Sequence, residues 1–318
     1  MAKIIDIIKN AKHTLFSFEI LPPLKGEDIR TLFSAIENLM EFNPPFIDVT
    51  YHREEYEYRI RENGLLEKVV VYKRPGTVAI SAAIMQRFNV EAVPHILCGG
   101  FNREETENAL LELDFLGIQN VLALRGDPIK SEGVFKPEKN GNAYASELVK
   151  QIKNLNKGIY LDEHLNNHKR TDFCVGVAGY PEKHHESPNL MVDLMNLKEK
   201  VTNGADYIVT QMFFDNKKYF DFVKKCREID INVPIIPGLK PITNKNQLTL
   251  LPRIFHLDIP EELSLEVMRA KDKEAVKRIG IEWCIHQSLE LKKAGVPVLH
   301  YYTMSKSDAI KEIASKVF

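Results

Sequence analysis

The stretch Phe18-Glu19-Ile20-Leu21-Pro22-Pro23 has the pattern of a β-strand that ends in two prolines. Successive side chains of a strand point to opposite faces, so Phe16 and Phe18 share one face, whereas Ser17 and Glu19 share the other. The prolines stop further pairing because proline has no N–H to donate. Glu19 is therefore expected at the carboxyl end of an early strand, where α/β barrels keep catalytic acids.

Short β-rich runs alternate with helix-period segments along the whole sequence, which favours parallel βα units. The eight expected strands span residues 15–21, 46–50, 91–97, 120–124, 173–179, 207–213, 234–237 and 298–302. Expected helices between them include residues 103–116, 189–203, 217–228 and 272–294. Eight strands with intervening helices are what a closed (β/α)8 barrel needs. The predicted fold class is α/β, a TIM barrel formed by residues 1–318 as a single domain.

An open doubly wound sheet is the alternative fold. Neither G-x-G-x-x-G after the first strand nor G-x-x-x-x-G-K-[ST] is present, which weakens that alternative. Residues 52–76, dense in Arg, Glu and Tyr, are expected to form a surface insertion. A helix that acts as a lid over the site is one structure that this insertion is considered to adopt. Residues 158–172 are expected to form a second surface insertion, and residues 129–143 a long loop above the fourth strand.

Bulk composition excludes several function classes. A formal net charge of -1 and a pI near 6.8 give no electrostatic reason to expect a nucleic acid or a membrane as partner. The four cysteines are far apart and lack metal-ligand spacing, so we expect buried thiols in a reducing compartment and no metal site. Residues 1–6 show no signal-peptide pattern, and no apolar run is long enough to span a bilayer. We therefore expect a soluble cytoplasmic protein.

Polar residues end almost every expected strand, and in a barrel these ends meet at one rim. They are Glu19, Thr50, Tyr51, His95, Arg125, Asp127, Tyr180, His184, Gln211 and His300, with Gly126 between Arg125 and Asp127. Taken singly, each has an ordinary explanation: Glu19 as a salt-bridged carboxylate inside the barrel, and His95 as a satisfied core histidine. Their convergence from several strands predicts a functional site.

One expected helix, residues 189–203, carries a further polar row. Asp193, Asn196 and Lys200 follow the i, i+3, i+7 spacing and therefore share one helix face. That face borders an apolar stripe, so a solvated flank is its default explanation.

Ten short motifs together resemble the methylenetetrahydrofolate reductase family, in the family's order and over nearly the whole chain. They are F-E-x-x-P-P at 18–23, V-T-Y at 49–51, P-H at 94–95, L-R-G-D at 124–127, Y-A-S at 144–146, Y-P-E-x-H at 180–184, L-K-x-K-V at 197–201, T-Q-x-F-F-D at 210–215, I-I-P-G at 235–238 and H-x-Y-T at 300–303. The resemblance implies a barrel that binds FAD at its carboxyl rim. It also implies ping-pong reduction of 5,10-methylenetetrahydrofolate to 5-methyltetrahydrofolate by a reduced nicotinamide, with NADH favoured.

The resemblance also assigns residue roles. Glu19 would be the general acid, because the amine nitrogen that leaves during ring opening must be protonated, and burial can raise a carboxyl pKa enough for this. Asp127 would contact the pterin and influence the flavin, and Gln211 would bind folate or nicotinamide. The cofactor would be held by Thr50, Tyr51, His95, Arg125, Gly126, Asp127, Tyr144, Ala145, Tyr180, His184, Asp193, Asn196 and Lys200. The folate would also meet Gln247, Leu251 and Lys306.

The chain departs from the family pattern at three places. His52-Arg53-Glu54-Glu55 stands where a small-residue run is expected, so flavin contacts from that loop are open. Leu251 replaces an aromatic residue and cannot stack on a ring as an aromatic does. Lys306 replaces an arginine, which keeps the charge and loses the bidentate fork.

Two other functions stay open. A flavin-free barrel lyase or aldolase would use a Schiff-base lysine at a strand end, and none stands at the eight expected ends. A flavin- or folate-binding protein without catalysis would not need Glu19. By family resemblance we expect a homo-oligomer. The chain ends at Phe318, and we therefore expect no large C-terminal regulatory domain.

Overall fold

A parallel barrel forms the body of the protein, as predicted. The computed structural model describes residues 2–129, 133–304 and 306–318. The barrel strands are β1 (Leu15–Ile20), β2 (Phe46–Val49), β5 (Glu91–Leu97), β6 (Asn120–Leu124), β7 (Cys174–Gly179), β8 (Tyr207–Thr210), β9 (Ile235–Ile236), β10 (Gly238–Leu239) and β11 (Val298–Tyr302). Their order is β10-β11-β1-β2-β5-β6-β7-β8-β9, and every pair is parallel.

The two ends of this order meet at Pro237. β9 pairs with β8 and β10 pairs with β11, and only Pro237 separates β9 from β10. Proline cannot donate to the ladder, but its carbonyl accepts from the His300 N–H at 3.1 Å. The expected strand 234–237 therefore runs on to Leu239, with a break inside it. Gly238 allows the close approach, because a Cβ there would lie 2.3 Å from the Thr210 carbonyl oxygen.

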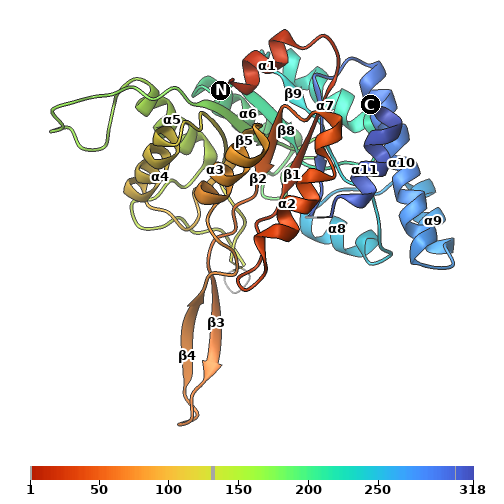
Figure 1. The fold of residues 1–318 in the computed structure, drawn as a ribbon, viewed down its shortest axis with the longest axis horizontal. Helices are drawn as coiled ribbons and strands as arrows, with labels where there is room; N and C mark the ends of the chain where they lie inside the picture. The colour runs from red at the N-terminus through yellow and green to blue at the C-terminus, as the bar shows by residue number, and fades with distance from the viewer. Residues whose placement is uncertain (1, 130–132, 305) are drawn as a thin grey trace.

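Helices surround the barrel (Figure 1). They are α1 (Ile4–Asn10), α2 (Ile29–Glu37), α3 (Thr77–Phe88), α4 (Arg103–Phe115), α5 (Ala145–Asn156), α6 (Leu190–Thr202), α7 (Asn216–Glu228), α8 (Gln247–Phe255), α9 (Glu261–Arg269), α10 (Lys273–Lys293) and α11 (Asp308–Val317), with a 3-10 turn at Met40–Phe42. Outward-facing strand residues such as Val121 and Val175 pack under them in the main core. Among the described residues, no helix is both long and apolar enough to cross a membrane.

The amino ends of the strands are closed by packing. Ile4 of α1 is fully buried in a cluster with Phe46, Val93 and Val298, and its N–H donates to Asn120 Oδ1 at 2.9 Å. The carboxyl ends of the strands are therefore the end of the barrel where a site can form.

Residues 52–76 form an arm rather than the lid helix considered from the sequence. β3 (Glu55–Ile60) and β4 (Leu66–Val71) pair antiparallel in a sheet of their own, and the hairpin projects away from the barrel (Figure 1). Residues 158–172 are irregular and mostly exposed. The loop expected at 129–143 is irregular where it is described, and its residues 130–132 lie outside the described part. All four cysteines are buried and free.

Candidate functional site

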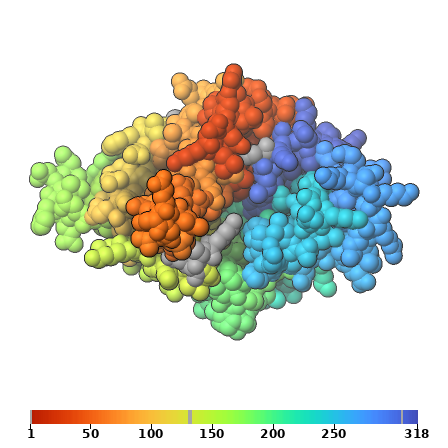
Figure 2. Space-filling view, turned by 90° about the horizontal axis from the view of Figure 1, so that it is seen from below, coloured from red at the N-terminus to blue at the C-terminus, as the bar shows by residue number. Residues whose placement is uncertain are grey.

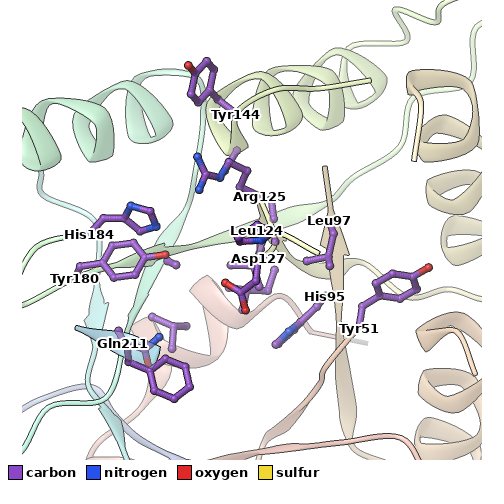
Figure 3. A pocket seen from close by; sticks show the side chains of 18 of the residues that line it. Tyr51, His95, Leu97, Leu124, Arg125, Asp127, Tyr144, Tyr180, His184 and Gln211 are labelled. Carbon is purple, nitrogen blue, oxygen red and sulfur yellow. The ribbon is translucent and has the colours of Figure 1, made fainter. Parts of the chain in front are cut away.

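A cavity of about 880 Å³ opens at the carboxyl end of the barrel. Figure 2 views the molecule from the side to which the arm projects and shows the surface hollowed beside the arm. Fifteen residues proposed from the sequence line the cavity: Glu19, Thr50, Tyr51, His95, Arg125, Gly126, Asp127, Tyr144, Ala145, Tyr180, His184, Asp193, Asn196, Lys200 and Gln211. Figure 3 shows Asp127, His95, Gln211 and Tyr180 around a common space, whereas Tyr144 lies away from them.

Three ionisable side chains meet deep in the barrel, and we call Glu19, Asp48 and His95 the acid floor. His95 Nε2 lies 3.5 Å from a Glu19 carboxylate oxygen and 3.6 Å from a carboxylate oxygen of Asp48. Asp48 is only 1% exposed. In the described part of the chain, neither Asp48 oxygen has a hydrogen-bond partner, nor has His95 Nε2. These separations are longer than good hydrogen bonds, so the group interacts mainly through charge.

Burial disfavours the charged form of every group in the acid floor. Desolvation raises the pKa of Glu19, although His95 beside it acts in the opposite direction. Desolvation likewise raises the pKa of Asp48 to about 6 and lowers the pKa of His95. Burial therefore favours the protonated form of Glu19 more than that of a solvent-exposed carboxyl group.

Two more ionisable side chains border the acid floor. Nδ1 of buried His300 on β11 forms a hydrogen bond of 2.9 Å with the Ser17 hydroxyl. A positive charge on His300 would lower the pKa of Asp48. Lys240, also buried, has its pKa lowered by desolvation, and its charge acts to lower the pKa of Glu19. Lys240 directly follows β10, so the premise that no lysine ends a strand is wrong. Lys240 is not among the described residues that line the cavity.

Four more polar side chains line the same cavity, and we define Arg125, His184, Asp193 and Lys200 as the polar wall. Arg125, after β6, pairs with Glu186 at 2.5 Å, and its guanidinium lies 4.8 Å from the centre of the Phe135 ring. This pairing fixes a cation at the rim. The guanidinium remains charged at any pH the protein meets.

Asp193 organises the loop after β7. It accepts from the His184 N–H at 3.2 Å and from the Ser187 hydroxyl at 2.8 Å. Burial, followed by the neighbouring His185 and Arg125 charges, lowers the pKa of His184 to about 4. The His184 imidazole is therefore neutral at pH 7.

Lys200 projects from α6 into the polar wall. Its ammonium donates to the Ala178 carbonyl at 3.0 Å and lies 6.0 Å from the centre of the Tyr180 ring. Desolvation lowers the pKa of Lys200 to about 8. The helix face that the sequence allowed to be a solvated flank is thus part of the cavity.

Three proposed folate residues are not among the described lining residues. Gln247 Oε1 accepts from the N–H groups of Thr243 and Asn244 at the start of α8. Leu251 is buried against a small cluster around α8 and α9. Lys306 is exposed, two residues beyond the lining residue Met304.

Sequence reasoning missed Asp48 and Arg53. Asp48 is the one charged residue in the apolar run 46–49, a signal that was available. Arg53 lines the cavity with its side chain 10% exposed, and its Nη2 donates to Glu138 at 3.1 Å. Its Nε and Nη1 are buried without a hydrogen-bond partner in the part of the chain that is described.

The Methylenetetrahydrofolate reductase family matches residues 3–317. The chain belongs to this family. It is 33% identical to Methylenetetrahydrofolate reductase (NADH) 1 of Arabidopsis thaliana, over 95% of this chain and 48% of that protein. It is 31% identical to 5,10-methylenetetrahydrofolate reductase of Salmonella typhimurium, over 92% of this chain and 86% of that protein. The chain thus spans about half the length of its plant relative.

A solved structure shows the same fold at low identity. A Clostridium thermocellum protein that binds two copies of 5-methyl-5,6,7,8-tetrahydrofolic acid superposes with a TM-score of 0.59 and 14% identity, covering 98% of this chain and 97% of that one. At this identity the likeness concerns the fold. Membership of the methylenetetrahydrofolate reductase family rests on the sequence match.

Proposed function

We propose that this chain is an FAD-dependent reductase that converts 5,10-methylenetetrahydrofolate to 5-methyltetrahydrofolate with a reduced nicotinamide. The observation that carries the proposal is Glu19, a largely buried carboxyl group at the base of the rim cavity, whose pKa is raised by burial. Family membership supports the substrate class. In this proposal residues 1–318 act as one FAD-binding catalytic domain.

The residues present fit an anionic, ring-bearing cofactor. The cavity of about 880 Å³ lies in the size range of ligand pockets. Arg53 and Thr50 line it with buried polar atoms that lack partners within the described chain, and such atoms are expected to find one in the functional state. When bound, FAD supplies the hydride chemistry that links the nicotinamide to the folate.

The polar wall would hold the charged part of FAD. Arg125 and Lys200 are cationic donors, suited to a pyrophosphate, and neutral His184 can donate one hydrogen bond. Asp193 can accept from ribose hydroxyls. The remaining proposed contacts are Thr50, Tyr51, His95, Gly126, Asp127, Tyr144, Ala145, Tyr180 and Asn196.

Glu19 would give its proton to the amine nitrogen that leaves when the methylene-bridged ring opens. The O–H bond of the carboxyl group breaks as the N–H bond forms, and the carbon–nitrogen bond electrons stay on nitrogen. A raised pKa is the requirement for this role. Asp127 and Gln211 would position the pterin, and Gln211 would also meet the nicotinamide, because one cavity serves both substrates in turn.

NADH is the proposed donor, by analogy with bacterial forms of the family. Stopped-flow reduction of the enzyme by NADH and by NADPH tests this choice. Faster reduction by NADPH at equal concentration would reverse it.

We further propose a cytoplasmic homo-oligomer. In this proposal Gln247, Leu251 and Lys306 lie near the folate.

Absorbance of the purified protein tests the whole proposal. We expect a yellow protein that NADH bleaches without oxygen and that 5,10-methylenetetrahydrofolate turns yellow again. A colourless protein that cannot take up FAD would favour a flavin-free lyase or aldolase. A yellow protein that the folate leaves bleached would favour a binding protein without catalysis.

A further inference from the structure

The arm at residues 55–71 has one apolar face. Residues directly opposite each other in an antiparallel pair share a face. The pairs on this face are Tyr56 with Val70, Tyr58 with Lys68, and Ile60 with Leu66. The other face carries Glu55, Glu57, Arg59 and Glu67, with Val69 and Val71.

The arm is poorly supported by the rest of its own chain. Ile60 is 78% exposed, Leu66 67% and Tyr58 60%, and the hairpin stands clear of the barrel (Figure 1). An isolated two-stranded hairpin is marginally stable in water and needs further strands or a packing partner. Within the described chain, no backbone hydrogen bond from outside the hairpin reaches residues 56–60. Residues 56–60 of β3 therefore present an open strand edge.

The sequence of this edge is complementary to itself. Residues 55–61 read Glu-Tyr-Glu-Tyr-Arg-Ile-Arg, so the charges reverse sign about Tyr58. If two copies of β3 lie antiparallel with Tyr58 opposite Tyr58, Glu57 lies opposite Arg59 of the other copy. In the same register Glu55 lies opposite Arg61, and Tyr56 lies opposite Ile60. Opposite charges and aromatic–aliphatic pairs are the cross-strand neighbours that stabilise a sheet.

We propose that β3 pairs with β3 of a second copy of this chain across a two-fold axis at Tyr58, forming a four-stranded sheet β4-β3-β3-β4. A two-fold contact requires one surface that is complementary to itself, and residues 55–61 meet that requirement on both faces. The apolar row of one arm continues into that of the other.

Existing ion pairs do not prevent this pairing. Glu57 lies 3.6 Å from Arg59 of its own chain, Arg61 pairs with Glu67, and Glu55 pairs with Lys73 at 2.6 Å. The side chains of all six are at least 35% exposed. Exposed pairs are worth only about 0–1 kcal/mol, so exchanging them for pairs across the axis costs little.

Charge reversal tests the register. Glu57→Arg and Arg59→Glu should each raise the dimer dissociation constant at least about tenfold, because each places two like-charged pairs opposite each other. The double variant restores opposite charges and should associate like the wild type. An equimolar mixture of the two single variants should form a heterodimer, since every pair is again opposite in sign. Sedimentation velocity on the full chain measures all four samples.

The outcomes separate cleanly. A monomeric wild type, or single variants that associate as the wild type does, would overturn the proposal. Single variants that dissociate but do not recover on mixing would also overturn it, because charge pairing would then not be the cause. A folding defect cannot mimic recovery on mixing. Since association is measured rather than catalysis, the result is independent of the proposed function.

A cysteine pair tests the position of the axis. Tyr58→Cys should form an intermolecular disulfide under mild oxidation, because the two side chains meet at the axis. Lys68→Cys is the matched control, since Lys68 lies directly opposite Tyr58 on the same face. Two copies of β4 would be about 14 Å apart, beyond the reach of a disulfide. Equal cross-linking of the two variants, or none with Tyr58→Cys, would place the axis elsewhere.

Discussion

The acid floor and the polar wall border the same cavity but differ in how their charged groups are partnered. In the floor, His95 lies 3.5 Å from Glu19 and 3.6 Å from Asp48, and burial favours the neutral form of each of the three groups. In the wall, Arg125 is held by an ion pair at 2.5 Å. Asp193 accepts two hydrogen bonds there.

This difference indicates a division of labour. A site that buries its carboxyl groups favours their protonation and can supply a proton. A site that pairs and hydrogen-bonds its ions keeps them charged and can bind a charged ligand. The floor is therefore suited to chemistry, and the wall to holding the cofactor.

The largest expected effect comes from removing the floor's acid. Glu19→Gln should slow reoxidation of the reduced flavin by 5,10-methylenetetrahydrofolate about 10²–10⁴-fold, the usual contribution of a general acid. Flavin reduction by NADH should change little, because that step needs no proton from Glu19. Anaerobic stopped-flow measures both half-reactions. Equal loss of both would contradict the division between floor and wall.

Removing a wall cation should weaken the cofactor instead. Lys200→Gln should raise the FAD dissociation constant about 10–100-fold, the value of a charged hydrogen bond. Because the pKa of Lys200 is about 8, its charge falls as pH rises through that value, and wild-type affinity should fall with it. The variant should lack this fall. Flavin fluorescence measures both.

Lys198→Gln is the matched control for the wall. Lys198 lies on the same helix with its side chain 38% exposed, 3.6 Å from Asp230, and it does not line the cavity. The FAD affinity of the Lys198→Gln variant should match that of the wild type. Similar losses in both variants would mean that α6 contributes general charge rather than a specific contact.

A smaller effect is expected from Asp48→Asn. The Asp48 charge helps to raise the pKa of Glu19, after desolvation and against the effect of His95. Without it the pKa of Glu19 falls. The folate half-reaction needs the protonated acid, so its rate in the variant should begin to fall at a lower pH than in the wild type. Flavin reduction should keep its pH profile. If the pH at which the folate half-reaction loses rate is unchanged or higher in the variant, Asp48 does not raise the pKa of Glu19.

The smallest effect concerns a residue outside both regions. Lys306→Ala should raise the KM for the folate by no more than about fivefold, the limit for an exposed ion pair, and leave flavin content unchanged. Lys316→Ala, another exposed lysine, is the control. Equal KM values for the wild type and Lys306→Ala would place the folate tail elsewhere.

Much of the barrel and the cavity was predictable, because carboxyl ends of parallel strands converge on one rim wherever the strands are recognised. Glu19, Asp127 and Gln211 were found this way. Lys240 was missed because a strand was assumed to stop at Pro237, whereas pairing resumes beyond it through Gly238 and Leu239.

The arm was missed for a different reason. Its charge density suggested a solvated helix, and the period-two pattern of Tyr56, Tyr58 and Ile60 was not used. Gly64, with a φ of 79°, supplies the positive-φ turn residue that a hairpin favours. The acid floor depends on distances between three strands, and no local pattern in the chain encodes these.

The protonation state of Glu19 is the centre of this account. Infrared difference spectroscopy between the wild type and Glu19→Gln, recorded across neutral pH, measures it directly. We predict that the wild type shows a carboxylic-acid carbonyl band at pH 7 and that Glu19→Gln lacks it. In Asp48→Asn the band should disappear at a lower pH than in the wild type. A carboxylate band at pH 7, with no acid band assignable to Glu19, would contradict the account.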